Sequence, residues 1–176
     1  MLDYAVLYCS ETGNTKQVAF QIFSALPGQD KDILSLDEID TIPEAKTYFV
    51  GFFVNKGTCS VEVIRCLEHL GGKNIALFGT CGSSPTEEYK KMVENQVSVW
   101  IEGDNTYLGM FLCQGKMPIQ IRRKYEDMRT AQNARQVERL LANFDEAMLH
   151  PGEKDFEAAR QFAREMAGKV QKDIVA

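Results

Sequence analysis

DYAVLYCSETGNTKQVAFQIFSAL, residues 3–26, contains a strand, a loop and a helix in that order. The run at 3–9 is apolar without alternation, which predicts a strand buried on both faces. Val18, Ile22 and Leu26 recur at helical spacing and Pro27-Gly28 follows, so residues 15–26 are predicted to form an amphipathic helix. This strand–loop–helix unit opens the chain, and its pattern recurs further along.

The rest of the chain repeats the alternation. Strands are expected at 32–36, 47–53, 74–78 and 106–113, and helices at 60–70, 85–101 and from about 151 onward. The helix at 85–101 is expected to bury Tyr89, Met92, Val93, Val97 and Trp100, and the last helix Phe156, Ala159, Ala163, Met166 and Val170. Apolar strands alternating with helices indicate an α/β fold: one domain over residues 1–176, a three-layer sandwich around a five-stranded parallel sheet.

Composition narrows the class of protein. The 176 residues are 44% hydrophobic and 26% charged, which is typical of a globular domain and excludes a disordered chain. The longest apolar run, Tyr48–Val54, is far shorter than the roughly 20 residues of a membrane span. The N-terminus has no basic and apolar leader, so a cytoplasmic location is expected. Five cysteines without C-x-x-C spacing predict reduced thiols and no zinc site.

Charge is distributed unevenly. The net charge is −5, which argues against nucleic-acid binding. Residues 1–115 hold 8 basic and 15 acidic side chains, a net charge of −7, whereas 116–176 carry +2. The first part of the chain is therefore expected to attract a partner protein with a basic docking face.

In a parallel α/β sheet the ligand site lies at the carboxyl ends of the strands. The loops expected there are 10–15, 54–59, 79–86 and 114–118. The first of them consists of Ser10, Glu11, Thr12, Gly13, Asn14 and Thr15. Hydroxyls, an asparagine and a glycine at a helix N-terminus favour a phosphate group, because backbone N–H groups and the helix dipole attract an anion. The alternative is an ordinary capped turn, since the same residue types are common N-caps.

The pattern S-x-T-G-N-T at 10–15 resembles the phosphate loop of flavodoxins, which bind flavin mononucleotide (FMN). Two further loops match the family by position. Phe53, Val54, Asn55, Lys56, Gly57 and Thr58 stand where its first flavin loop lies, and Thr80, Cys81, Gly82 and Ser83 where the second lies. The resemblance covers 1–113 and 150–173. It implies a flavodoxin-like sheet of order 2-1-3-4-5, noncovalent FMN and electron transfer with a redox partner.

The resemblance has departures. Flavodoxins usually place a Trp and a Tyr on the two faces of the flavin ring, whereas the first loop here offers only Phe53. Pro85 stands near the position of the Tyr, and Tyr89 follows one helical turn later, either to stack on the ring or to pack in the core. In the family a glycine such as Gly57 controls the flavin N5 atom, usually beside acidic residues. Lys56 stands there instead, either favouring full reduction of the flavin by its charge or serving as a solvated loop residue.

The segment 114–149 is an insertion relative to the family. It contains a basic cluster, Arg122–Lys124, and a predicted helix whose apolar stripe is Ala134, Val137, Leu141, Phe144 and Met148. Two accounts of the stripe stay open. It packs over the domain's own sheet end, or it forms the interface of a homodimer or of a partner complex.

Other chemistries are weaker. Cys59 and Arg65 have the C-x5-R spacing of cysteine phosphatases, but the residues between them read as the first turns of a helix rather than as a glycine-rich loop. A phosphoacceptor aspartate after the third strand is missing, since Asn55 stands there. The sequence is also compatible with two alternatives to an electron carrier: a small FMN-dependent NAD(P)H reductase, and an accessory module that binds flavin weakly or not at all.

Overall fold

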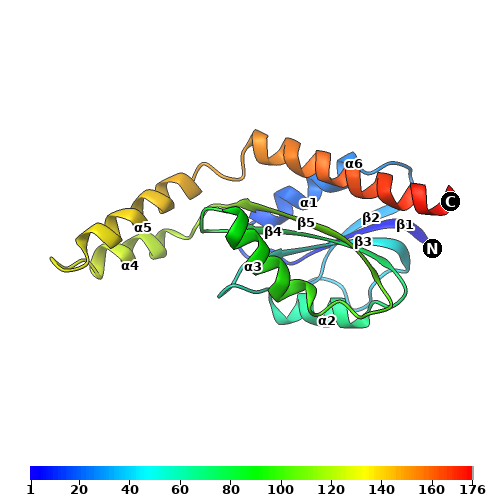
Figure 1. The fold of residues 1–176 in the computed structure, drawn as a ribbon, viewed down its shortest axis with the longest axis horizontal. Coiled ribbons are helices and arrows are strands. Elements are labelled where there is room, and N and C mark those ends of the chain that lie inside the picture. The colour runs from blue at the N-terminus through cyan, green and yellow to red at the C-terminus, as the bar shows by residue number, and fades with distance from the viewer. Residues whose placement is uncertain (176) are drawn as a thin grey trace.

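The fold is a five-stranded sheet between two layers of helices (Figure 1). A computed structural model describes residues 1–175. The strands are β1 (Leu2–Tyr8), β2 (Lys31–Ser35), β3 (Ala45–Phe53), β4 (Asn74–Cys81) and β5 (Thr106–Gln114). Their order is β2-β1-β3-β4-β5 and every neighbouring pair is parallel. The predicted fold class and strand order are confirmed.

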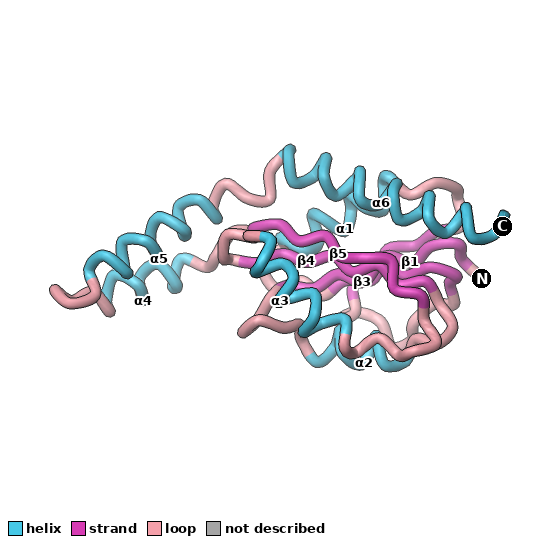
Figure 2. The backbone as a smooth tube through the Cα atoms, viewed as in Figure 1, coloured by secondary structure: helices cyan, strands magenta, loops and turns pink. Residues whose placement is uncertain are grey.

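Each face of the sheet has its own core. The helices α1 (Asn14–Ala25) and α6 (Glu153–Val175) contact each other on one face, and α2 (Val61–His69) and α3 (Glu87–Ser98) cover the other (Figure 2). The predicted apolar stripe of α1 is confirmed, because Val18, Ile22 and Leu26 are all buried. On α6 the predicted stripe is buried from Ala159 to Val170, so both helices are held by apolar contact with the sheet.

The predicted buried face of α3 is wrong in part. Val93 and Val97 are fully buried, whereas Met92 is 44% exposed and Trp100 37% exposed. Both the buried pair, Val93 and Val97, and the exposed Met92 and Trp100 fit a helical apolar stripe in the sequence. Packing of the helix on the sheet buries only the narrower stripe. Thr86 rather than Pro85 precedes the helix, and its side-chain oxygen accepts a hydrogen bond from Tyr89 N at 3.2 Å.

The insertion forms a helical hairpin that projects beyond the sheet (Figure 1). Its helices are α4 (Ile119–Asp127) and α5 (Ala134–Ala147), which contact each other. Arg129 pairs with Glu138 at 2.6 Å near the tip, and Arg122 pairs with Asp145 near the base. The guanidinium of Arg122 also lies 5.6 Å from the Phe144 ring centre, a cation–π contact.

The apolar stripe of α5 packs against α4 rather than over the sheet end. Val137 and Phe144 are buried, while Met148, at the end of the stripe, is 40% exposed. The helix α4 was absent from the sequence prediction. Its sequence IQIRRKYED has no clear apolar stripe, and none of its residues is fully buried, so periodicity carries little signal there.

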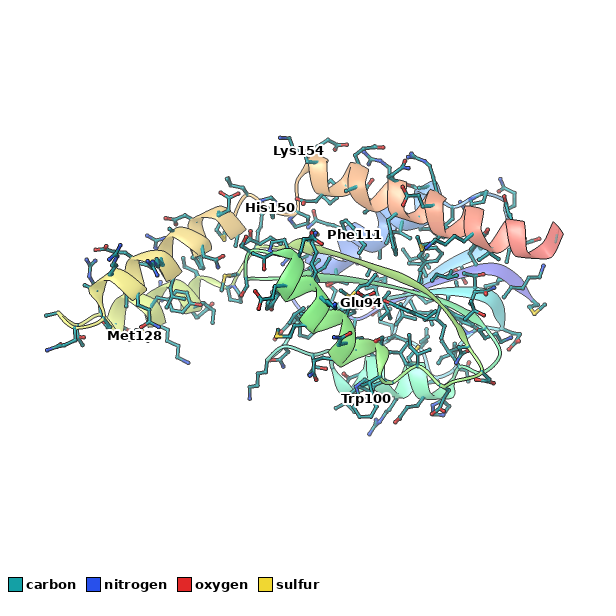
Figure 3. All side chains as sticks on the ribbon, in the orientation of Figure 1. Glu94, Trp100, Phe111, Met128, His150 and Lys154 are labelled. Atoms are coloured by element: carbon teal, nitrogen blue, oxygen red, sulfur yellow. The ribbon has the colours of Figure 1, made fainter. Side chains whose placement is uncertain are left out.

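His150 joins the hairpin to α6, at the junction labelled in Figure 3. Its Nδ1 lies 2.6 Å from Asp155 Oδ2 in α6, and its Nε2 lies 3.2 Å from Glu146 Oε1 in α5. The hydrogen bond with Asp155 raises the pKa of His150 above its ordinary value of 6.5, more than burial lowers it. The His150 imidazole therefore links two carboxylates from two helices, and the contact favours its protonated form.

This contact predicts a pH dependence of stability. A raised pKa means that the folded state binds the proton more tightly, so the stabilisation is full below about pH 6.5 and is lost as the pH rises through the folded-state pKa. The free energy of unfolding in urea should therefore differ between wild type and His150→Gln more at about pH 5.5 than at about pH 8.5. His69→Gln is the matched control, because within residues 1–175 the other histidine is hydrogen-bonded to the carbonyl of Arg65 and to no carboxylate. An equal difference at both pH values contradicts the assignment.

Candidate functional site

The loop before α1 is shaped to receive an anion. Gly13 lies at φ +87°, a left-handed conformation that glycine adopts at little cost, and it gives α1 no side-chain cap. Ser10 Oγ accepts a hydrogen bond from Lys16 N at 3.2 Å. Within residues 1–175, the backbone N–H groups of Asn14 and Thr15 donate to no protein acceptor. Free N–H groups at a helix N-terminus bind phosphate and carboxylate oxygens.

Two buried side chains tie this loop to the neighbouring strand ends. Asn14 Nδ2 donates to Lys116 O at 2.8 Å and to Thr12 Oγ1 at 3.0 Å. Thr15 Oγ1 lies 2.9 Å from Thr80 Oγ1 at the end of β4. Because the side chains of Asn14 and Thr15 form hydrogen bonds within the protein, the groups left for a ligand are the backbone N–H groups and the hydroxyls of the loop that face outward.

The loop after β3 is a tight turn. Asn55 N donates to Thr58 O at 2.8 Å and Thr58 N to Asn55 O at 3.1 Å, with Lys56 at φ +51° and Gly57 at φ +84°. Positive φ at both central residues is the geometry of a type I′ turn. Asn55 and Lys56 are exposed, so the lysine charge stands in solvent at the tip of this loop.

A cavity of about 180 Å³ opens at the carboxyl ends of β3, β4 and β5. Its lining includes eight of the predicted residues, namely Glu11, Thr12, Asn14, Phe53, Val54, Thr80, Cys81 and Gly82. Ser10, Gly13 and Thr15 belong to the adjoining loop and helix start, while Asn55, Lys56, Gly57, Thr58 and Ser83 lie in the two flanking loops without lining the cavity. The structure therefore brings together residues from all three predicted loops.

The sequence prediction missed one wall of this cavity. Gly115, Lys116, Met117 and Pro118, which follow β5, complete the lining. The segment 114–118 was among the expected ligand loops, but it has no hydroxyl or nest pattern to single out its residues. A Cβ on Gly115 would lie 2.7 Å from Asn14 Nδ2, so only glycine lets the two loops approach this closely.

A larger hollow of about 840 Å³ lies elsewhere. It is bordered by the non-helical connection between β2 and β3 and by α2, and includes Ile39, Tyr48, Arg65 and Lys73. Its lining contains no residue of α1 and none of the loops that follow β3, β4 and β5. The volume of a hollow therefore does not by itself identify the ligand site. The smaller cavity has the convergent polar groups that a cofactor requires.

The thiols near the cavity are not activated. Burial raises the pKa of the Cys81 thiol to about 12 and that of Cys9 to about 11. Cys59 is also buried with a raised pKa, and α2 begins two residues after it. Residues 61–64, between Cys59 and Arg65, are therefore helical, and the segment cannot wrap an oxyanion. Among the described residues, none of the His, Cys, Asp and Glu side chains group into a metal site, and no helix is long and apolar enough to cross a membrane.

Comparison with known proteins agrees with this geometry. Residues 5–164 match the family described as Flavodoxin domain. The chain belongs to the flavodoxin family. It is 35% identical over 170 residues to the flavodoxin-like domain-containing protein BilS of Clostridioides difficile strain CD3, covering 94% of this chain and 96% of the relative. It is 26% identical over 179 residues to BilS of Clostridium symbiosum strain WAL-14163, covering 92% and 94%.

A solved flavodoxin shows the same fold. The Streptococcus pneumoniae TIGR4 flavodoxin superposes with a TM-score of 0.57 at 19% identity, covering 94% of this chain and 98% of that one. In the present chain, Tyr89 packs against the core on the α2 and α3 face, and burial raises the pKa of its hydroxyl. Phe53 is the aromatic residue that lines the cavity.

The contact between the two loops predicts a sensitive position. Gly115→Ala would push Asn14 away from Lys116 O and should lower the free energy of unfolding by roughly 1–3 kcal/mol. Gly103→Ala is the control, because a Cβ there meets nothing within 4 Å. Chemical denaturation of the ligand-free protein measures both changes. Equal stability of the two variants would show that the loops do not need this close approach.

Proposed function

We propose that this protein binds FMN noncovalently and carries electrons to and from a redox partner. The observation that carries the proposal is the uncapped start of α1, whose free N–H groups open beside the cavity between the loops of β3, β4 and β5. This combination of an anion-binding helix start and a hollow at the strand ends suits a phosphorylated ligand with a planar head. Membership of the flavodoxin family supports it.

The residues present fit the cofactor. The phosphate would be held by the N–H groups of Asn14 and Thr15 and by the hydroxyls of Ser10 and Thr12. A cavity of about 180 Å³ is smaller than the 300–1,000 Å³ or so that usually encloses a drug-sized ligand. We infer that its end beside the α1 start receives the phosphate, while the flavin ring lies against its other end and extends toward the open mouth between the 53–58 and 80–83 loops.

The chain's own part is binding and tuning. FMN supplies transfer of one electron at a time when it is bound. The α1 start holds the phosphate by neutral donors, and Phe53 and Met117 offer apolar surface beside the ring position. The turn at Lys56 and Gly57 presents backbone groups and one positive charge near the ring. None of these residues acts as a general acid or base.

The expected partner is a protein with a basic docking face. Glu11 lines the cavity, and Glu87 and Glu88 form the exposed first turn of α3 next to the 80–83 loop. Together with the net charge of −7 over residues 1–115, these carboxylates favour a cationic partner close to the flavin. Such a complex weakens as salt is added.

Phosphate recognition is tested by comparing FMN with riboflavin. Thr12→Val removes one hydroxyl donor of the nest and should weaken FMN binding about tenfold, with riboflavin binding unchanged. Thr41→Val, which alters the larger hollow instead, should leave both affinities as in wild type. Titration of the apoprotein, followed by flavin fluorescence, measures all three proteins. A wild type that binds neither flavin would refute the proposal and leave a non-redox accessory role.

The charge at Lys56 is tested by potentiometry of the FMN-loaded protein. A cation near the ring favours the fully reduced, anionic flavin, so Lys56→Glu should make the potential of the second electron more negative by on the order of tens of millivolts. Lys56→Asn removes the charge in a residue that tolerates the left-handed conformation and should give a smaller shift. NADPH alone should leave the flavin oxidised. Rapid bleaching by NADPH would instead favour a reductase.

A further inference from the structure

The loop after β4 is held by a side chain from the inserted hairpin. Asn143, in α5, donates from Nδ2 to Gly82 O at 2.9 Å and accepts at Oδ1 from Ser84 N at 3.1 Å. The two bonds grip the backbone on both sides of Ser83. Because Ser84 N–H can only donate, it fixes which end of the Asn143 amide faces the loop.

Gln114 closes the cluster from the end of β5. Its Nε2 donates to Gly82 O at 2.9 Å and to Asn143 Oδ1 at 3.1 Å. Gln114 is only 3% exposed, so these bonds are shielded from water and leave its amide group with protein partners. The conformation of the loop is therefore set jointly by β5 and by α5.

The gripped loop forms a wall of the cavity. Gly82 lines it opposite Met117, and a Cβ on Gly82 would lie 3.0 Å from Met117 Sδ. Met117 itself lies two residues before α4, and Asn143 Nδ2 lies 4.0 Å from its sulfur. Three segments distant in sequence thus meet at Asn143: the loop after β4, the loop after β5 and the hairpin.

The position of Asn143 depends on the packing of the hairpin. The next two residues along α5, Phe144 and Asp145, are the ones that contact Arg122 of α4. A shift of α5 relative to α4 would carry Asn143 with it and release Gly82 and Ser84. The base of the hairpin is therefore connected mechanically to the cavity wall.

We propose that Asn143 is a positioning residue through which the α4–α5 hairpin holds the 82–84 loop in the conformation that receives the flavin ring. The inference rests on the proposed function, and it concerns the ring side of the site, not the phosphate side at α1. Asn143 acts through the loop and does not itself line the cavity.

The test uses the full chain with FMN and with lumiflavin, which has the ring but no phosphate. Asn143→Leu keeps the volume of the side chain and removes both hydrogen bonds. It should weaken binding of lumiflavin and of FMN by the same factor, about tenfold. Asn133→Ala is the matched control: the same residue type at the other end of α5, bonded to Thr130 and to Met128 O and remote from the cavity. It should leave both affinities unchanged.

A second measurement tests the hydrogen bonds of Asn143 to the 82–84 loop without any flavin. In the apoprotein, hydrogen exchange at Ser84 N–H should accelerate about tenfold in Asn143→Leu and stay at the wild-type rate in Asn133→Ala. Should Asn143→Leu fail to fold, Asn143→Ser, whose hydroxyl cannot reach both partners, takes its place.

The outcomes are distinct. Tight flavin binding by wild type together with unchanged lumiflavin affinity in the Asn143 variant overturns the positioning role and leaves the proposed function intact. Equal weakening by the Asn133 variant also overturns it, because the effect would then come from general loosening of the hairpin. Absence of flavin binding in wild type refutes the proposed function and this proposal with it, whatever the exchange rate at Ser84.

Discussion

Two phenylalanine rings, each lying against a glycine of the neighbouring strand, set the centre of the sheet. In the β3–β4 register Gly51 faces Phe78 and Phe52 faces Gly79. A Cβ on Gly51 would lie 2.2 Å from the Phe78 ring, and one on Gly79 2.8 Å from the Phe52 ring. Because successive residues point to opposite faces, Phe52 fills one core and Phe78 the other. A slip of one residue would oppose the two rings, so the register is tightly specified.

The β3–β4 register also sets the geometry of the cavity at the carboxyl ends of the strands. With Phe52 opposite Gly79, Phe53 pairs with Thr80, and both residues line the cavity at the point where the strands end. Thr80 then meets Thr15 of α1 at 2.9 Å, which brings the helix start to the same edge. The 10–15 loop, the tight turn at Lys56 and the 80–83 loop therefore converge because of packing in the sheet.

The sequence predicts those features of the structure that depend on residues close together in the chain. The strands are continuous apolar runs, the stripe of Val18, Ile22 and Leu26 has helical spacing, and the 10–15 loop has the residue types of an anion nest. What it does not predict depends on contacts distant along the chain. Nothing near Asn143 in sequence indicates that its amide meets Gly82, 61 residues away. For Tyr89 the sequence leaves two roles open, and the structure adds that its half-buried side chain packs against the core on the α2 and α3 face.

The hairpin poses a separate physical problem, because two short helices bury little apolar surface on their own. Only Val137, Phe144 and Ala147 of α5 are buried, and none of α4. Its base is nevertheless fixed by polar contacts on three sides: Arg122 with Asp145, Asn143 with the 82–84 loop, and His150 with Asp155 of α6. Among the residues that the structure describes, no hydrogen bond or ion pair joins its tip, where Met128 is exposed, to the sheet (Figure 3). The polar contacts at the base therefore fix the orientation of a hairpin that has few apolar contacts, and the contact from Asn143 also holds the loop that forms a wall of the cavity.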